Sequence, residues 1–135
     1  MKKFCFLIQA RNDDDYFNQF DSDDSDCYVL FFNKPSNRKN SIYAPNTSWN
    51  QGRNLLLETA FEKEDYEYYI FMDDDARIVD NFDNRINCVE EFKQLLLKKK
   101  PAIAFPDHHW HLLGSSGTNR GNAKTKAIKL GIARE

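Results

Sequence analysis

Short, almost continuously apolar runs alternate with helix-like segments along this chain, and this alternation limits its possible folds most strongly. Four runs have the length and composition of strands buried on both faces: FCFLIQA (4–10), CYVLFF (27–32), YYIFM (68–72) and AIAF (102–105). Segments with helical periodicity separate the last three runs. This pattern predicts an α/β fold with a mostly parallel, Rossmann-like sheet that is flanked by helices and joined by right-handed crossovers.

The first helix is predicted within TSWNQGRNLLLETAFEKED (47–65). Ser48 can act as its N-cap, and Gln51 follows three residues later, which is the spacing of a capping box. A stripe of mostly apolar residues at helical spacing then predicts the buried face, and it consists of Leu55, Leu56, Thr59, Ala60 and Phe61.

The second helix is predicted within NRINCVEEFKQLLLKKKP (84–101). Its apolar positions recur at helical spacing, at Ile86, Val89, Phe92 and Leu96. Lys98 to Lys100 put positive charge where the helix dipole favours it, and Pro101 ends the pattern. The segments 33–48 and 106–127 lack such regularity and are expected to be loops.

A length of 135 residues predicts a single domain over 1–135. The 19 basic and 21 acidic side chains argue against a nucleic-acid binder that depends on overall positive charge. Basic residues gather in the segment 112–135, which is expected to be either a solvated, flexible end or a docking tail for an anionic partner.

No apolar run approaches the roughly 20 residues that cross a bilayer, and the opening apolar stretch is too short for a signal peptide. The three cysteines Cys5, Cys27 and Cys88 lie in apolar surroundings without metal-type spacing, so they are expected to be core residues in a reducing compartment. Together these features predict a cytoplasmic protein without a membrane span.

The third strand-like run stops at three aspartates, in YIFMDDDARI (69–78). Ligands of open α/β sheets bind at the carboxyl ends of the strands, and carboxylate oxygens suit hard cations such as Mn²⁺ and Mg²⁺. Asp73 and Asp75 would share one side if the strand continued past Met72. The alternative is a solvated acidic turn. A second triplet, Asp13 to Asp15, instead leads into YFNQF and is expected to form the first turn of a short helix.

The segment NQGRNLLLETAFEKEDYEYYIFMDDDARI (50–78) resembles GT-A fold nucleotide-sugar glycosyltransferases, family 2-like. In that family a Gly-x-Arg-Asn-like helix start precedes a strand that ends in an Asp-x-Asp motif. FLIQARN and YVLFFN are similar to the family's first two strands. The resemblance covers about residues 4 to 105 and implies a GT-A sheet.

The resemblance implies a role for each matching residue. Asp75 would be the principal metal ligand, Asp73 would contact the ribose or the metal and its water, and Asp74 would lie between them near the nucleotide. Arg53 would face the nucleotide beside a helix N-terminus. The base would be approached by the end of the first strand, at Ala10, Arg11 and Asn12. The implied cofactor is Mn²⁺ or Mg²⁺, and the implied partners are a nucleotide sugar, in the first place a UDP-sugar, and a carbohydrate or other hydroxyl acceptor.

Two departures from the family concern the base and the acceptor. Asn33 and Lys34 stand where the family commonly has acidic residues that contact the base. Only 60 residues follow Asp75, which leaves little chain for an acceptor-binding half, so further domains or a homo-oligomer would supply it.

Within this chain, Asp107 is the candidate catalytic base, and His109, from the group His108, His109 and His111, is a candidate additional metal ligand.

Two other functions remain open on the same residues. One is a nucleotide-binding module without transfer activity. The other is a metal-dependent phosphohydrolase or nucleotidyltransferase that uses the same carboxylates. An aspartate within the first strand would favour a hydrolase, and FCFLIQA has none.

Overall fold

The computed structural model describes residues 2–79, 88–104, 108–112 and 124–129. The chain divides into two compact units, residues 1–74 and 75–135. That the whole chain forms one domain stays a prediction.

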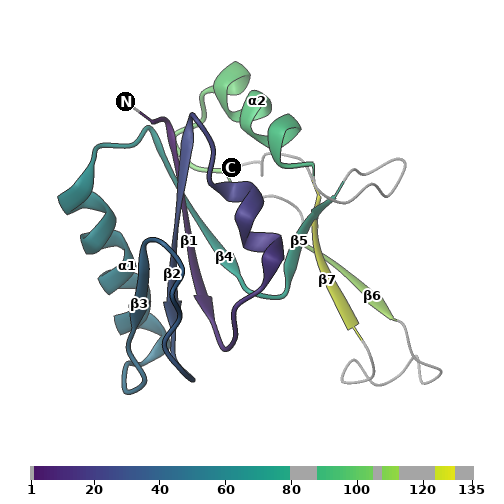
Figure 1. Cartoon of the computed structure of the whole chain (residues 1–135). Coiled ribbons are helices and arrows are strands. Elements are labelled where there is room, and N and C mark those ends of the chain that lie inside the picture. The colour runs from purple at the N-terminus through teal and green to yellow at the C-terminus, as the bar shows by residue number, and fades with distance from the viewer. Residues whose placement is uncertain (1, 80–87, 105–107, 113–123, 130–135) are drawn as a thin grey trace. The chain divides into compact units, whose positions relative to one another are not determined.

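The first unit is built on a four-stranded sheet in the order β3-β2-β1-β4 (Figure 1). Its strands are β1 (Phe4–Ala10), β2 (Ser25–Phe31), β3 (Ser41–Tyr43) and β4 (Tyr68–Asp73). All three pairings are parallel, which confirms the predicted α/β character. The three-residue strand β3 lies in a segment that the sequence predicted to be a loop.

The two faces of this sheet are covered by different helices. Helix α1 (Trp49–Lys63) packs on one face, where Leu56 and Ala60 join a buried cluster with Leu7 and Leu30. The short 3₁₀ helix η1 (Asp15–Phe20) covers the other face. Residues of β1 alternate between these faces, since Leu7 belongs to the α1 cluster while Phe6 stacks on Phe20 of η1.

Helix α1 begins as the sequence predicts. The Ser48 Oγ accepts the N–H of Gln51 at 3.1 Å, and the Gln51 side chain accepts the N–H of Ser48 at 2.8 Å, so the capping box is confirmed. The predicted stripe is correct for Leu56 and Ala60 but wrong for Phe61, which is 54% exposed. The position one turn before Leu56 on the buried face is taken instead by Gly52.

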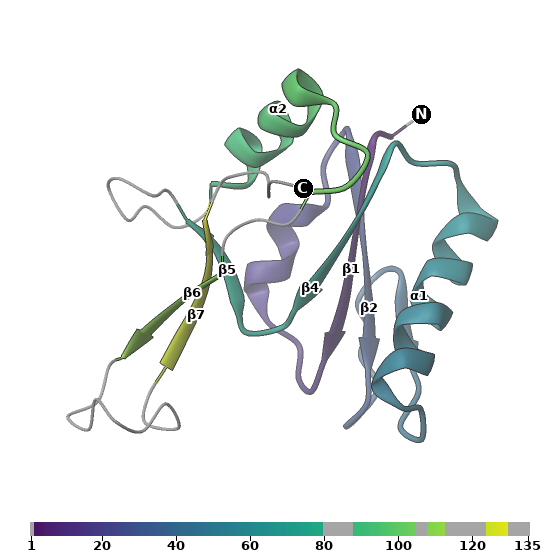
Figure 2. The same ribbon diagram turned by 180° about the vertical axis from the view of Figure 1, so that it is seen from behind.

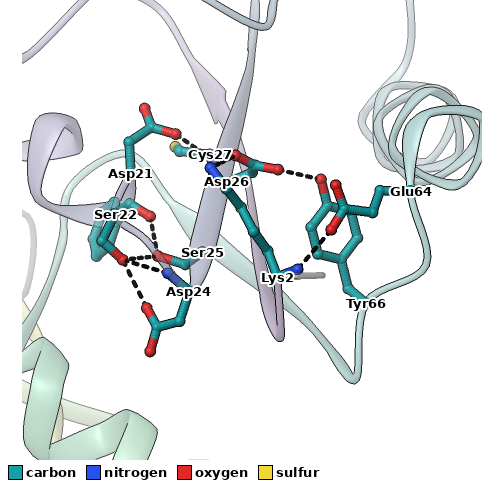
Figure 3. A network of polar contacts seen from close by, with 10 residues as sticks. Lys2, Asp21, Ser22, Asp24, Ser25, Asp26, Cys27, Glu64 and Tyr66 are labelled. Atoms are coloured by element: carbon teal, nitrogen blue, oxygen red, sulfur yellow. Dashed lines mark hydrogen bonds and ion pairs between the residues drawn. The ribbon is translucent and has the colours of Figure 1, made fainter.

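A polar network ties three distant segments together at the start of the parallel strands (Figure 3). The Lys2 Nζ lies 2.7 Å from Oδ1 of Asp26, and the Tyr66 hydroxyl donates to the other oxygen of that carboxylate. The backbone N–H of Lys2 donates to Glu64 at 2.6 Å. Because Asp26 is nearly buried, this network fixes the N-terminal end of the sheet rather than forming an open site.

The predicted cysteine environments are confirmed, because Cys5, Cys27 and Cys88 are free thiols and fully buried. Burial raises the pKa of Cys5 to about 12, and the nearby Asp26 carboxylate adds to this rise. A thiol with such a pKa stays protonated near neutral pH and serves as a core side chain.

The second unit contains helix α2 (Val89–Lys99) and a three-stranded sheet in the order β5-β7-β6. Strand β5 (Ala76–Val79) pairs in parallel with β7 (Lys124–Lys129), and β6 (His108–Leu112) pairs with β7 in the antiparallel direction (Figure 2). The predicted loop segment 106–127 therefore holds all of β6 and the first part of β7. The basic segment 112–135 contains the whole of β7.

The predicted second helix is confirmed over 89–99, and residues 84–87 lie outside the described residues. It ends where Lys100 takes a left-handed conformation, φ 48°, just before Pro101. The predicted strand 102–105 is wrong for residues 102–104, because Ala102 and Ile103 form a bend and Ala104 is irregular, and Phe105 lies outside the described part. Ile103 is 68% exposed, so this short apolar run does not enter a sheet. Nowhere in the described ranges does a helix have the length and apolar character needed to span a bilayer.

Candidate functional site

The carboxyl ends of β1 and β4 lie next to each other at one edge of the parallel sheet. Gln9 of β1 is in register with Asp73, the last residue of β4. Just beyond the strands, the backbone N–H of Arg11 donates to Oδ2 of Asp74, with N and O 3.2 Å apart. The segments that follow the two strands are thereby joined through a carboxylate of the second aspartate triplet.

The strand that carries this triplet ends at Asp73, and Asp74 and Asp75 form a turn before β5. The strand geometry expected past Met72 continues for one residue only, so strand alternation does not bring Asp73 and Asp75 to one side. Asp73 and Asp74 are partly exposed, and Asp75, which begins the second unit, is exposed. The role of Asp75 as principal metal ligand stays a prediction.

Arg53 is held against two aromatic rings near the start of α1. Its Cζ lies 3.9 Å from the ring centroid of Trp49, one helical turn earlier, and 4.9 Å from that of Phe71 on β4. Its Nη2 lies 3.6 Å from Oδ1 of Asp73, which is an ion pair but too long for a hydrogen bond. Burial lowers the pKa of Arg53 and Asp73 opposes this change, and a guanidinium remains charged at neutral pH.

The guanidinium is poor in hydrogen bonds. Its Nε is buried, and in the part of the chain that the structure describes this atom has no hydrogen-bond partner. Buried donors in native proteins usually have one. Arg53 is thus held by stacking on two rings and by its charge contact with Asp73.

Gly52 allows the start of α1 to approach the end of β1. A Cβ at this position would lie 2.1 Å from Nε2 of Gln9 and 3.0 Å from its Cδ. The Gln9 side chain therefore lies directly against the backbone of the helix. Because Gln9 and Asp73 are register partners, this close approach puts the first turns of α1 beside the carboxyl edge of the sheet.

Two amide side chains lie where the resemblance implies that the base is approached. The Asn33 Nδ2 donates to Oδ1 of Asn12 at 3.3 Å, and both residues are exposed. The carbonyl of Ala10 accepts the N–H of Phe32 at 3.3 Å, which holds the two strand ends together. Amides can both donate and accept hydrogen bonds, whereas the carboxylates common at this point in the family only accept.

The first aspartate triplet is occupied by local structure. Oδ1 of Asp13 pairs with Nη2 of Arg38 at 2.8 Å, and its Oδ2 accepts the Ser36 hydroxyl at 2.9 Å. Partial burial alone would raise the pKa of Asp13, but the hydrogen bonds from Ser36 and Arg38 outweigh it and lower the pKa. Asp14 caps η1 by accepting the N–H of Tyr16 at 2.8 Å. The prediction that this triplet belongs to the start of a short helix is confirmed.

The carboxylates at the sheet edge suit a hard divalent cation that shares its coordination shell with a ligand. Mg²⁺ commonly uses one or two carboxylates, with water and phosphate in the remaining positions, and Asp73 and Asp74 supply two. Among the described residues there is no group of three side chains that could hold a metal ion. A cation bound by Asp73 and Asp74 would have to complete its coordination shell with water or with ligand oxygens such as those of phosphate.

The two remaining predicted site residues belong to the second unit. Asp107 lies outside the described residues. His109 lies on β6, paired with Ala127 of β7, where only the backbone is described. Their roles as catalytic base and as metal ligand stay predictions.

Sequence reasoning missed Gln9, Trp49 and Phe71. The available signal was spacing, because Trp49 precedes Arg53 by one helical turn and Phe71 precedes Asp73 by two strand positions. Each pair therefore projects from one face of its element. The sequence pattern of the helix and that of the strand do not predict that these two faces meet.

Comparisons with known proteins assign no family to this chain. No protein-family model matches the sequence, and no curated protein or solved structure matches it. The resemblance of residues 50–78 to GT-A glycosyltransferases stays a prediction, and the functional argument rests on the residues of the first unit.

Proposed function

We propose that this chain is a metal-dependent glycosyltransferase that moves a sugar from a nucleoside diphosphate sugar, in the first place a UDP-sugar, to an acceptor hydroxyl. The observation that carries the proposal is a stacked arginine beside a strand-ending aspartate at the carboxyl edge of a parallel sheet. Ligands of open α/β sheets bind at this edge. A planar, positively charged guanidinium suits phosphate oxygens.

Each residue at this edge has a distinct part in the proposal. Arg53 binds the diphosphate and opposes its charge, and the N-terminal turn of α1 adds a favourable dipole. Asn12 and Asn33 offer amide groups to the base. Asp73 and Asp74, with the adjoining Asp75, hold the cation. A bound Mn²⁺ or Mg²⁺ would supply Lewis-acid stabilisation of the diphosphate leaving group.

The transfer itself exchanges one bond to the anomeric carbon for another. The bond from this carbon to the phosphate oxygen breaks, the acceptor oxygen bonds to the same carbon, and the acceptor proton passes to a base. Asp107 is the proposed base, since it follows the second helix in the chain and carries one of the few carboxylates beyond it.

Calorimetry with a panel of nucleoside diphosphates tests the binding part of the proposal. We expect binding in the presence of Mn²⁺ and none in the presence of a chelator, because the aspartates alone would repel a diphosphate. Arg53→Ala should weaken binding by about tenfold or more, the size of a lost charge-assisted contact, while thermal melts show that the variant still folds. Equal affinity with Mn²⁺ and with chelator would refute the proposal.

A nucleotide-binding module without transfer activity is the second candidate. It needs only the nucleotide-binding groups of the first unit, Arg53 with the amides of Asn12 and Asn33, and no catalytic base. A turnover assay separates the candidates, including the hydrolytic one. A sugar moved to an acceptor supports the transferase, release of inorganic phosphate or nucleoside monophosphate supports the hydrolase, and tight binding without turnover supports the module.

A further inference from the structure

The contact between Arg53 and Asp73 joins two groups that the proposed site would use for opposite charges. Asp73 is a candidate cation ligand, and Arg53 is a candidate diphosphate ligand. The two groups partly neutralise each other's charge across 3.6 Å. Arg53 cannot bind a diphosphate at full strength while it is paired with Asp73. In the same way, Asp73 cannot bind a cation at full strength while it is paired with Arg53.

The geometry shows that Arg53 is held in this position by more than the ion pair. Trp49 is 58% exposed, yet its ring lies 3.9 Å from the guanidinium carbon, and Phe71, which is 38% exposed, lies 4.9 Å from it. A guanidinium is attracted to the face of an aromatic ring, and more strongly where water is excluded. The rings fix the plane of the guanidinium without using any of its N–H groups.

We propose that Trp49 and Phe71 are positioning residues that hold Arg53 on Asp73, so that a cation and a diphosphate bind cooperatively. A cation that arrives alone must compete with Arg53 for the Asp73 carboxylate. A diphosphate that arrives with the cation takes over Arg53 while the cation takes over Asp73, and both charges gain a partner. The second half of this inference rests on the proposed function, and the first half concerns the free protein alone.

Thermodynamic linkage predicts in which direction the removal of Arg53 changes the affinity for Mn²⁺, and a purely structural arginine would not produce this direction. If Arg53 competes with the cation, its removal must tighten the binding of Mn²⁺ alone and reduce the gain in nucleotide affinity that Mn²⁺ provides. A partly exposed ion pair contributes up to about 1 kcal/mol, which corresponds to about fivefold in affinity. A structural role would instead weaken both ligands together.

The test is a titration of the whole chain with Mn²⁺ alone, followed by electron paramagnetic resonance, and a second titration with UDP at saturating Mn²⁺ and in chelator. We expect Arg53→Gln to bind Mn²⁺ about three- to fivefold more tightly than the wild type, and to lose most of the Mn²⁺-dependent gain in UDP affinity. Trp49→Leu keeps the charge but removes one ring, so it should tighten Mn²⁺ binding in the same direction by a smaller factor.

Arg38→Gln is the matched control. Arg38 stacks on Phe17 at 5.6 Å and pairs with Asp13 at 2.8 Å, so it is a second arginine held by a ring and an aspartate in the same unit. Its replacement should leave Mn²⁺ affinity unchanged. Melting temperatures identify any variant that fails to fold, and Arg53→Lys, which keeps the charge, should return Mn²⁺ affinity toward the wild-type value.

Each outcome decides the inference. Unchanged or weaker Mn²⁺ binding by Arg53→Gln overturns it, and so does equal tightening by Arg38→Gln, which would indicate a general charge effect. Tightening by Arg53→Gln but not by Trp49→Leu overturns the part played by the rings. Tightening by both variants without UDP binding under any condition supports the competition and refutes a UDP-dependent function. A wild type and variants that bind no Mn²⁺ refute both the competition and the proposed function.

Discussion

Gly52 shows how a single residue determines the approach of a helix to a sheet. The Gln9 amide occupies the space that a side chain at position 52 would need, with Nε2 only 2.1 Å from the place of a Cβ. Glycine inside a helix costs about 1 kcal/mol relative to alanine. The close contact with Gln9 explains why a glycine stands at position 52. The alternation of strands and helices in the sequence does not explain it.

The first prediction concerns this contact. Gly52→Ala alone should fail to give the roughly 1 kcal/mol gain in helix stability, because the Gln9 amide must move away. In a Gln9→Ala background the same substitution should stabilise the protein by about that amount. Urea denaturation of the four proteins measures the coupling energy, and additive free energies of unfolding would show that the contact is not restrictive.

The two aspartate triplets are alike in sequence and different in surroundings. Asp13 is paired with Arg38 and Ser36, whereas Asp75 is exposed in the turn after β4. We predict that Asp75→Asn abolishes metal-dependent nucleotide binding while the unfolding free energy changes little. Asp13→Asn should cost about 0.5–1 kcal/mol of stability and keep Mn²⁺ binding. Calorimetry and thermal melts of both variants check this. If Asp13→Asn abolished metal-dependent binding and Asp75→Asn did not, the second triplet would be only a solvated turn.

At the scale of elements, the start of α1 depends on its capping box. Ser48→Ala removes the acceptor for the Gln51 N–H and should lower the free energy of unfolding by about 1 kcal/mol. Thr59→Ala in the same helix is the control, since its hydroxyl bonds only to the Leu55 carbonyl one turn earlier and alanine favours the helix interior. Urea denaturation should therefore show a loss for Ser48→Ala and none for Thr59→Ala. Equal losses would contradict the capping argument.

The sequence predicts the strands of this chain with different success. The runs that became β1, β2 and β4 are longer and apolar. Strands β1 and β2 are buried as predicted, whereas β4 is mostly half-buried, with Met72 buried and Phe71 exposed, so its predicted burial on both faces is wrong. Strand β3 has three residues and only partial burial, so it lacks a sequence signal and exists through its pairing with β2. The run 102–104 has the signal and no partner in the described part of the chain, and it forms no strand, with Ile103 exposed.

At the scale of the whole molecule, the first unit is closed by the network around Asp26. This carboxylate accepts from Lys2 near the N-terminus and from Tyr66 in the connection between α1 and β4 (Figure 3). Burial alone would raise the pKa of Asp26, but the hydrogen bonds from Lys2 and Tyr66 outweigh it and lower the pKa. Segments separated by up to 64 positions are thereby held at one end of the sheet.

This network predicts a defined sensitivity to acid. Because the pKa of Asp26 is lower in the folded state, its stabilisation is complete above the unfolded-state value of about 3.9 and is lost as the pH falls through the folded-state pKa. Asp26→Asn should lower the free energy of unfolding by about 2 kcal/mol at pH 7, and its difference from the wild type should shrink below about pH 4.

Urea denaturation between pH 7 and pH 2.5 measures this difference. Asp23→Asn is the control, because Asp23 is exposed, and it should track the wild type throughout. A difference between Asp26→Asn and the wild type that stays constant down to pH 2.5 would show that the charge of Asp26 does not contribute.

The sequence by itself determined the local features of this protein: three parallel strands, the position and cap of α1, the last turns of α2, the buried cysteines and the aspartates at the end of β4. These follow from periodicity, capping chemistry and hydrophobicity, which act over a few neighbouring residues. Only the tertiary structure decided that Asp13 pairs with Arg38, that Gln9 lies against Gly52, and that Trp49 and Phe71 hold Arg53 beside Asp73. Such contacts join residues far apart in the chain, so they depend on the register of β1 with β4 and on the packing of α1, and no pattern within a single element contains that information.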